Sequence, residues 1–172
     1  MITLDDYKGQ VPAWCPGCGN FAILKAFKEA FVEMEIEPHQ FILVSGIGQS
    51  GKYPPYLMCN TFNGLHGRSL PVATGAKLAN HEMLVVAVAG DGDCYGEGGN
   101  HLIHAARRNI GITTICFNNS IYGMTGGQYS PTTPVGATAT TAPYGHLEPA
   151  FYLCELAKAA GASLVARGTA YH

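Results

Sequence analysis

The sequence predicts an α/β fold in which helices cover a largely parallel sheet. Short, continuous apolar runs lie at residues 41–45, 84–89 and 112–117, with a weaker run at residues 163–166. Continuous runs of this length are typical of strands that are buried on both faces. Segments with helical spacing alternate with these runs, and this alternation indicates a parallel sheet.

Three segments have apolar residues every three or four positions and are expected to be helices: residues 19–34, 97–109 and 148–160. Gly161 follows the third segment, as is common at the C-terminus of a helix. Residues 120–147 are rich in Gly, Thr and Pro and have no clear period. A loop of this length in a compact domain is usually functional.

The composition limits the classes of protein to which the chain can belong. Its 172 residues have no linker-like segment, so residues 1–172 are expected to form a single domain. A net charge of -2 provides no basic surface for nucleic acid. No apolar run approaches the ~20 residues of a membrane span, and no signal peptide opens the chain. We therefore expect a cytoplasmic protein without a membrane anchor.

Charged residues make up only 13% of the chain, about half the usual share of roughly 25%. Either partner subunits cover much of the surface, or the surface is simply neutral. The six cysteines are not expected to form disulfides, because nothing else in the sequence indicates secretion.

Polar motifs follow two of the apolar runs, namely Gly90-Asp91-Gly92-Asp93 and Asn118-Asn119. The 25 residues between Gly92 and Asn118 fit one strand-helix-strand crossover, so the two strand ends should be neighbours. Glycines allow the backbone to approach a phosphate. The carboxylate of Asp91 and an amide oxygen of Asn118 or Asn119 are suitable ligands for Mg²⁺. Gly-Asp-Gly alone is most often a tight turn, but the combination indicates a phosphate and metal site.

These two motifs resemble the thiamine-diphosphate fingerprint. Four further segments narrow the resemblance to the β subunit of 2-oxoacid:ferredoxin oxidoreductases, and within it to the 2-oxoglutarate branch. They are Trp14-Cys15-Pro16-Gly17-Cys18-Gly19, Ser45-Gly46-Ile47-Gly48, Leu65-His66-Gly67-Arg68 and residues 122–132. The resemblance covers nearly the whole chain. It implies a three-layer thiamine-diphosphate-binding fold that lacks a C-terminal portion of the family's longer chain.

The resemblance also implies roles for individual residues. Asp91 and Asn119 match the side chains that bind Mg²⁺ and the cofactor, and Ile121 matches the position that offers a backbone carbonyl to the metal. Eight more residues are expected along the cofactor: Gly90, Gly92 and Asp93 in the diphosphate loop, Gly123, Met124 and Thr125 beside the diphosphate and thiazolium, and Ile47 and Gly48 after the first strand.

The implied reaction converts a 2-oxoacid and coenzyme A into an acyl-CoA, CO₂ and two electrons for ferredoxin. The cofactor carries the difficult step, and the acid that activates its aminopyrimidine lies on another subunit, so an α subunit is an expected partner. His66 is either a hydrogen-bond donor to substrate or cofactor, or a structural residue. Lys52 is either a surface residue or a catalytic-site cation that binds a distal carboxylate of the substrate, and Arg68 is a candidate for either role.

Cys15 and Cys18 have the spacing of a metal or cluster pair, but a [4Fe–4S] cluster needs four thiolates. The family has a third cysteine where this chain has Gln49, and an amide oxygen is a poor ligand for iron. Cys59 could replace it only if the loop folds back. The sequence therefore leaves open an absent cluster or one with an atypical ligand.

Three alternatives remain at this point. One is the subunit of a non-oxidative thiamine-diphosphate enzyme, although such chains are usually far longer. Another is a metal-binding interaction module built on Cys15 and Cys18, which would leave the Gly-Asp-Gly and Asn-Asn motifs unexplained. The third is a fragment that folds but has no turnover on its own.

Overall fold

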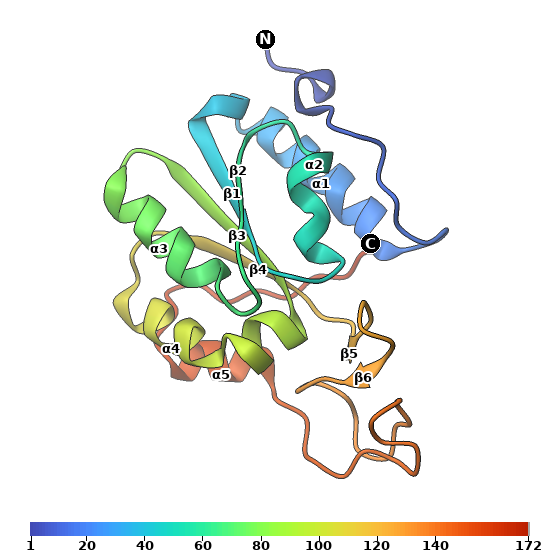
Figure 1. The fold of residues 1–172 in the computed structure, drawn as a ribbon. Helices are drawn as coiled ribbons and strands as arrows, with labels where there is room; N and C mark the ends of the chain where they lie inside the picture. Colours follow the sequence, from blue (N-terminus) through green and yellow to red (C-terminus); the bar gives the residue numbers. More distant parts are fainter. Residues whose placement is uncertain (172) are drawn as a thin grey trace.

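The computed structural model describes residues 1–171. Its centre is one sheet of four parallel strands in the order β2-β1-β3-β4 (Figure 1). These strands are β1 (Phe41–Ser45), β2 (Asn60–Asn63), β3 (Leu84–Gly90) and β4 (Thr113–Phe117). A separate antiparallel hairpin consists of β5 (Ile121–Tyr122) and β6 (Gln128–Tyr129). Three of the four expected strands and the parallel sheet are confirmed.

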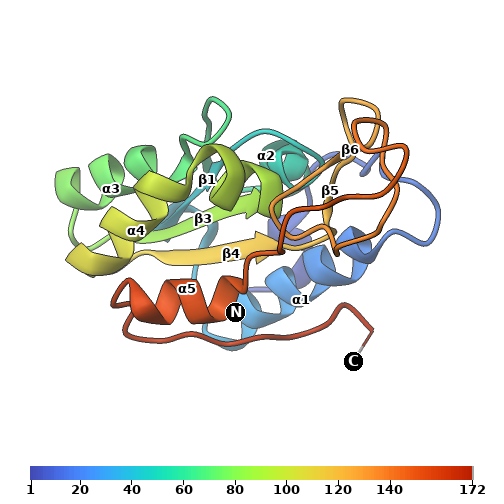
Figure 2. The same ribbon diagram turned by 90° about the horizontal axis from the view of Figure 1, so that it is seen from below.

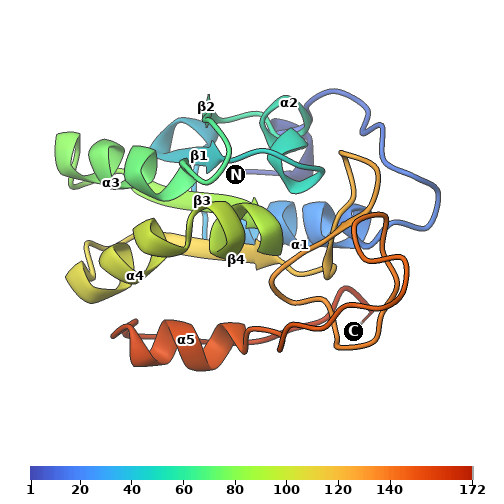
Figure 3. The same cartoon turned by 60° about the horizontal axis from the view of Figure 1, so that its bottom comes forward.

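Helices cover both faces of this sheet. The α-helices are α1 (Gly19–Glu33), α2 (Tyr53–Tyr56), α3 (Ser69–Ala79), α4 (Gly99–Arg108) and α5 (Leu153–Ala159). The shorter turns are the 3₁₀ helices η1 (Leu4–Tyr7), η2 (Pro38–Gln40) and η3 (Ser50–Lys52), and the π-helical turn η4 (Gly92–Glu97). Helix α1 lies on one face, and α3 and α4 lie on the other with α5 beside α4 (Figures 2 and 3). None of the helices in residues 1–171 is long and apolar enough to cross a membrane.

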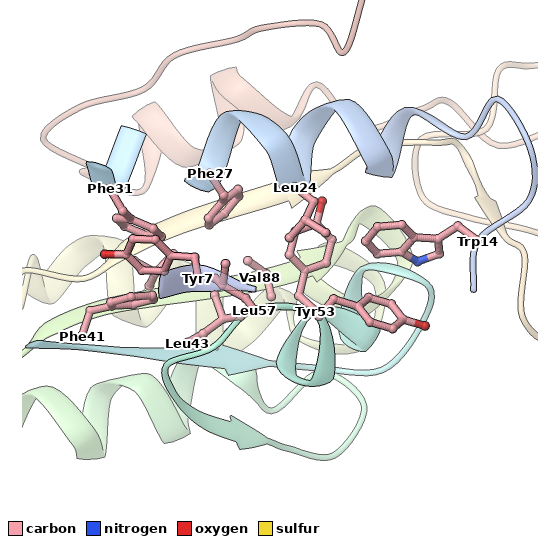
Figure 4. Close-up of a cluster of buried hydrophobic side chains, with 12 residues drawn as sticks. Tyr7, Trp14, Leu24, Phe27, Phe31, Phe41, Leu43, Tyr53, Leu57 and Val88 are labelled. Atoms are coloured by element: carbon pink, nitrogen blue, oxygen red, sulfur yellow. The ribbon is translucent and has the colours of Figure 1, made fainter. Parts of the chain in front are cut away.

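Alternate side chains of β1 and β3 enter two separate cores, as the two-residue period of a strand requires. The core on the α1 side receives Phe41, Leu43, Val86 and Val88 (Figure 4). The core under α3 and α4 receives Val44, Val85, Ala87 and Ala89. Both faces of the central strands are therefore buried, which explains why their sequences are continuously apolar.

Aromatic rings dominate the core on the α1 side. Phe31 of α1 packs on Phe41 of β1 with ring centroids 4.3 Å apart. Trp14 packs against Tyr53 at 5.1 Å and Tyr56 at 4.9 Å, and its indole N–H donates to the carbonyl of Gln49 at 3.0 Å. This packing fixes the N-terminal segment beside the loop that follows β1.

The expected strand at residues 163–166 is wrong, because this segment belongs to neither a helix nor a strand. Leu164, its largest apolar side chain, is 84% exposed. The segment therefore buries little apolar surface that would favour a place in the sheet.

Two elements were not expected from the sequence. Strand β2 is an exposed edge strand of sequence Asn-Thr-Phe-Asn, and it lacks any apolar run. Its asparagines replace hydrophobic packing, since Asn60 Nδ2 donates to the carbonyl of Phe41 at 3.2 Å and Asn63 Nδ2 donates to Ser45 Oγ at 3.0 Å. Helix α3 contains a proline and a glycine, which conceal a helix in a pattern-based analysis.

The three expected helices are confirmed, but two begin later than expected. Residues 92–97 form η4, so α4 begins at Gly99 rather than at residue 97. The backbone N–H of Phe151 donates to the carbonyl of Pro131 at 2.8 Å. This contact holds the chain before α5 against the segment after β6, and α5 begins only at Leu153.

Candidate functional site

Two buried carboxylates stand at the carboxyl end of β3 and bind different loops. Asp91 is 1% exposed and Asp93 is 2% exposed. Asp91 faces the segment after β4, whereas Asp93 faces the loops after β1 and before α3. Ligands of open parallel sheets bind beyond the carboxyl ends of the strands, so these loops form the candidate site.

Asp91 joins the end of β3 to the segment after β4. Its Oδ2 accepts hydrogen bonds from Ser130 Oγ at 2.5 Å and Thr132 Oγ1 at 2.6 Å. Its Oδ1 accepts a longer hydrogen bond from the backbone N–H of Asn119 at 3.3 Å. The expectation that the Gly-Asp-Gly and Asn-Asn motifs are neighbours in space is confirmed.

The two asparagines differ in how much acceptor capacity they retain. Oδ1 of Asn118 lies 2.8 Å from Thr132 Oγ1 and accepts the backbone N–H of Ser120 at 3.2 Å. The side chain of Asn119 is exposed, and its Oδ1 accepts only the N–H of Ile121, at 3.2 Å, among the residues described. Asn119 therefore has the freer oxygen for a metal ion.

The cluster around Asp91 contains more acceptors than donors. Thr132 has a single hydroxyl proton, yet its Oγ1 lies within hydrogen-bond distance of both Asp91 Oδ2 and Asn118 Oδ1. Within residues 1–171, Asp91 forms no salt bridge with a cationic side chain. A buried carboxylate without a counter-charge is costly. The oxygen-rich site therefore fits a hard divalent cation such as Mg²⁺.

One oxygen of the Asp93 carboxylate has its own set of partners, whereas the other has none within the described residues. Its Oδ1 accepts the backbone N–H groups of Ile47 at 3.1 Å and Gly67 at 2.8 Å, and it lies 2.9 Å from His66 Nδ1. Its Oδ2 is buried and has no partner within the described chain. Burial raises the pKa of Asp93, and the two backbone hydrogen bonds partly oppose that shift. This carboxylate joins the loops after β1 and before α3, whereas the backbone of Asn119 bonds to Asp91.

Two glycines are required by close packing inside the site. A Cβ on Gly46 would lie 1.8 Å from Asp93 Oδ2, and a Cβ on Gly92 would lie 2.3 Å from the ring of Tyr122. The hydroxyl of Tyr122 donates to the Gly92 carbonyl at 3.0 Å. By contrast, a Cβ on Gly90 would meet only ordinary contacts. The ring of Tyr122 therefore requires a glycine at position 92, independently of any contact between Gly92 and a phosphate.

The other expected residues lie around this centre. Gly123, Met124 and Thr125 form the exposed start of the turn between β5 and β6. Gly48 has a φ of 123°, which favours glycine. Lys52 ends η3, is half-buried and forms no ion pair within residues 1–171.

The cysteines do not assemble into a cluster site. Cys15 and Cys18 lie in one turn, in which the N–H of Cys18 donates to the carbonyl of Cys15 at 3.0 Å. The described residues contain no group of three or more His, Cys, Asp or Glu side chains that could hold a metal ion. The thiol of Cys59 instead packs against the core on the α1 side, where burial raises its pKa to about 12. Residues 1–171 do not fit a four-thiolate [4Fe–4S] site.

Sequence reasoning missed several residues of the site. Ser130 and Thr132 lie in the segment 122–132, but the sequence alone does not identify them as partners of Asp91. A hollow of about 220 Å³ beside them was also missed, and it is lined by Tyr122, Tyr129, Ser130, Pro131, His146, Glu148, Pro149 and Phe151. The concentration of hydroxyl residues in the long loop was the only available signal, and it did not identify their partner.

A parallel sheet with acidic and amide side chains gathered at its carboxyl edge defines a cofactor-binding α/β domain. Residues 46–171 match the family model described as "Thiamine pyrophosphate enzyme, C-terminal TPP binding domain". The chain belongs to this family, and the thiamine-diphosphate-binding fold expected from the motifs is confirmed.

Several relatives indicate a narrower group of proteins within this family. The chain is 53% identical over 159 residues to "2-oxoglutarate synthase subunit KorB" of Methanocaldococcus jannaschii, covering 92% of this chain and 59% of the relative. It is 44% identical over 168 residues to "2-oxoacid:ferredoxin oxidoreductase 2, subunit beta" of Aeropyrum pernix, covering 97% of this chain and 54% of the relative. The resemblance expected from the motifs is confirmed, and the chain spans little more than half the length of these relatives.

A solved structure of the same group of enzymes also matches this chain. A chain of "2-oxoglutarate:ferredoxin oxidoreductase from Magnetococcus marinus with 2-oxoglutarate, coenzyme A and succinyl-CoA bound" matches with a TM-score of 0.92 and 40% sequence identity. The match covers 94% of this chain and 56% of that chain.

The contact between Gly46 and Asp93 yields a stability prediction. Gly46→Ala should lower the free energy of unfolding by about 1–3 kcal/mol, because the new methyl group must displace a buried carboxylate. Gly75→Ala is the matched control, since a Cβ at Gly75 in α3 meets nothing within 4 Å. This control should be stabilising by roughly 0.5–1 kcal/mol. Urea denaturation measures both changes, and a neutral Gly46→Ala would contradict the packing described.

The cysteine arrangement yields a prediction about metal content. A polypeptide of this sequence, purified anaerobically, should contain far fewer than the roughly four iron and four sulfide ions of one [4Fe–4S] cluster per chain. Two neighbouring thiols cannot supply four ligands. Iron and acid-labile sulfide analysis measures this content, and about four of each per chain would show that a further ligand completes the site.

Proposed function

We propose that this chain is the thiamine-diphosphate-binding β subunit of a 2-oxoacid:ferredoxin oxidoreductase. The observation that carries the proposal is the 53–54% identity over 92% of the chain to four proteins named as 2-oxoglutarate synthase subunit KorB. The enzyme would oxidise a 2-oxoacid, with 2-oxoglutarate as the first candidate, and use coenzyme A to form an acyl-CoA and CO₂. An α subunit would complete the site, and ferredoxin would accept the electrons.

The geometry of the carboxyl edge supports this proposal. Asp91 and Asn119 would hold Mg²⁺ through their side-chain oxygens, and Ile121 would offer its carbonyl. Gly90, Gly92 and the backbone of Asp93 would lie along the diphosphate, with Ile47 and Gly48 on the neighbouring loop. Gly123, Met124 and Thr125 would cover the cofactor from the β5–β6 turn. When bound, thiamine diphosphate supplies the carbanion and the electron sink for decarboxylation.

Exposed apolar side chains near this edge support a partner subunit. Leu65 is 76% exposed, Leu147 is 87% exposed and Tyr152 is 75% exposed. Leu65 precedes α3, and Leu147 and Tyr152 precede α5, so exposed apolar surface in these loops favours an interface with another subunit. The low share of charged residues points the same way.

The Cys15–Cys18 turn favours neither alternative function. A metal-binding interaction module would need further ligands, and residues 1–171 bring none to this turn. A non-oxidative thiamine-diphosphate enzyme would use the same cofactor site, so the acceptor of electrons is the discriminating observation.

The direct test is the assembled enzyme. A complex of the full-length protein with its α subunit should reduce ferredoxin only when a 2-oxoacid and coenzyme A are both present. CO₂ release without ferredoxin reduction would favour the non-oxidative alternative.

Asp91→Ala in this complex should abolish Mg²⁺-dependent binding of thiamine diphosphate, measured by calorimetry. Asp5→Ala, which removes an exposed carboxylate, is the control, and undiminished binding by Asp91→Ala would disprove the metal assignment.

Lys52 provides a test of substrate class. If its ammonium group binds the distal carboxylate of 2-oxoglutarate, Lys52→Ala should raise the KM for 2-oxoglutarate more than the KM for pyruvate, which has no such group. A lost charge-assisted hydrogen bond of about 1.5–3 kcal/mol corresponds to roughly a 10- to 150-fold change. Lys25→Ala, on the exposed face of α1, is the control. Equal effects of Lys52→Ala on both substrates would remove the proposed role.

A further inference from the structure

The strongest unexplained feature of the molecule is the contact between His66 and Asp93. Two backbone N–H groups donate to one oxygen of Asp93, and Nδ1 of the His66 imidazole lies 2.9 Å from the same oxygen. The carboxylate is buried, whereas the His66 side chain is 38% exposed. A buried carboxylate therefore contacts one nitrogen of an imidazole ring that is itself partly exposed.

This geometry determines which ring nitrogen of His66 carries the hydrogen. Backbone N–H groups can only donate, so Asp93 Oδ1 accepts from both Ile47 and Gly67. If Asp93 is protonated, the proton belongs on Oδ2, which has no partner within residues 1–171. In either protonation state Oδ1 remains an acceptor. The neighbouring Nδ1 of His66 must therefore be the N–H donor, and the neutral ring leaves its lone pair on Nε2.

No side chain of the described residues makes a hydrogen bond to Nε2. The ring of Tyr122 lies beside that of His66, with centroids 5.9 Å apart, but its hydroxyl donates to the carbonyl of Gly92 at 3.0 Å. The titratable groups near the ring are Asp93 of η4 and Tyr122 of β5, together with Glu97, which lies close to Gly67, and Arg68, which is two residues further along the chain. Burial raises the pKa of Tyr122 to about 12, so this phenol stays protonated and uncharged near neutrality.

We propose that Asp93 positions His66 as a proton acceptor, with Nε2 directed to a proton-bearing group of the substrate. This inference rests on the proposed function and replaces the donor role expected for His66. An O–H or S–H bond of the substrate breaks, an Nε2–H bond forms, and the ring becomes an imidazolium that later returns the proton to water. The thiol of coenzyme A, which must lose its proton when a thioester forms, belongs to this class. Asp93 is the positioning residue, as a carboxylate is for the histidine of a catalytic triad.

The first test measures the hydrogen position without any turnover. In the complex labelled with ¹⁵N-histidine, one-bond N–H coupling should place the hydrogen of neutral His66 on Nδ1. Asp93→Asn should preserve this tautomer, because the amide Oδ1 accepts the same three donors, whereas Asp93→Ala should lose it. A hydrogen on Nε2 in the unmodified protein would overturn the proposal. This result is independent of activity, so it separates failure of the inference from failure of the proposed function.

The second test measures the proton transfer. In the complex, His66→Gln should lower kcat by about 10²- to 10⁴-fold, the usual contribution of a general base, with KM values within about threefold. The fall in wild-type kcat at acid pH should also disappear in His66→Gln. Asp93→Asn, which keeps the ring in place but removes the charge, should show a smaller loss. His104→Gln, an exposed histidine on α4, is the control and should behave like the wild type.

Single-turnover measurements then identify the proton donor. If His66→Gln slows thioester formation but not CO₂ release in the absence of coenzyme A, the thiol is the donor. If CO₂ release is also slowed, a hydroxyl group formed earlier in the reaction is the donor. If neither step changes, His66 is a structural residue and the proposal fails. Thermal unfolding of each variant shows whether a loss of activity reflects the fold.

Discussion

The burial of two carboxylates on either side of Gly92 is the constraint on which the rest of the site depends. A carboxylate leaves water only where N–H and O–H donors replace its hydration, and an unsatisfied one costs several kcal/mol. For Asp91 and for Oδ1 of Asp93 these donors come from the loops after β1 and β4, from the loop before α3 and from the segment after β6. Two side chains that are one residue apart therefore hold four separate loops together.

The sheet places these carboxylates where they can act in this way. Strand β3 is central and is covered on both faces, so its end projects into the crevice between the neighbouring loops. The chain then continues as the π-helical turn η4, a conformation that is frequent at functional sites. Its glycines admit the ring of Tyr122, since a Cβ on Gly96 would lie 2.1 Å from the phenolic oxygen. A regular helix of larger residues could not bring β5 this close to the end of β3.

The sequence predicts elements that depend on patterns of neighbouring residues, but it does not predict those that depend on contacts between distant segments. Strands β1, β3 and β4 and helix α1 were predictable because apolar runs and helical spacing are local patterns. Strand β2 was not, because its asparagines act through single hydrogen bonds to β1. The motifs located Asp91 and Asn119, yet the hydroxyl partners of Asp91 lie 39 and 41 residues further along the chain. The role of Asp93 was missed for the same reason, since tertiary packing selects its donors.

Asp91 and Asp93 have different partners, and this difference suits one of them to bind a metal ion and the other to position a base. Asp91 has hydroxyl and amide neighbours but no cationic side chain, and the exposed Asn119 stands beside it. Its charge is therefore available to a metal ion. Asp93 already has an imidazole at 2.9 Å, and its backbone donors leave no room for a metal on Oδ1. Because these two side chains bind different loops, the carboxylate that would bind a cation and the carboxylate that would position a base have separate partners although only one residue separates them.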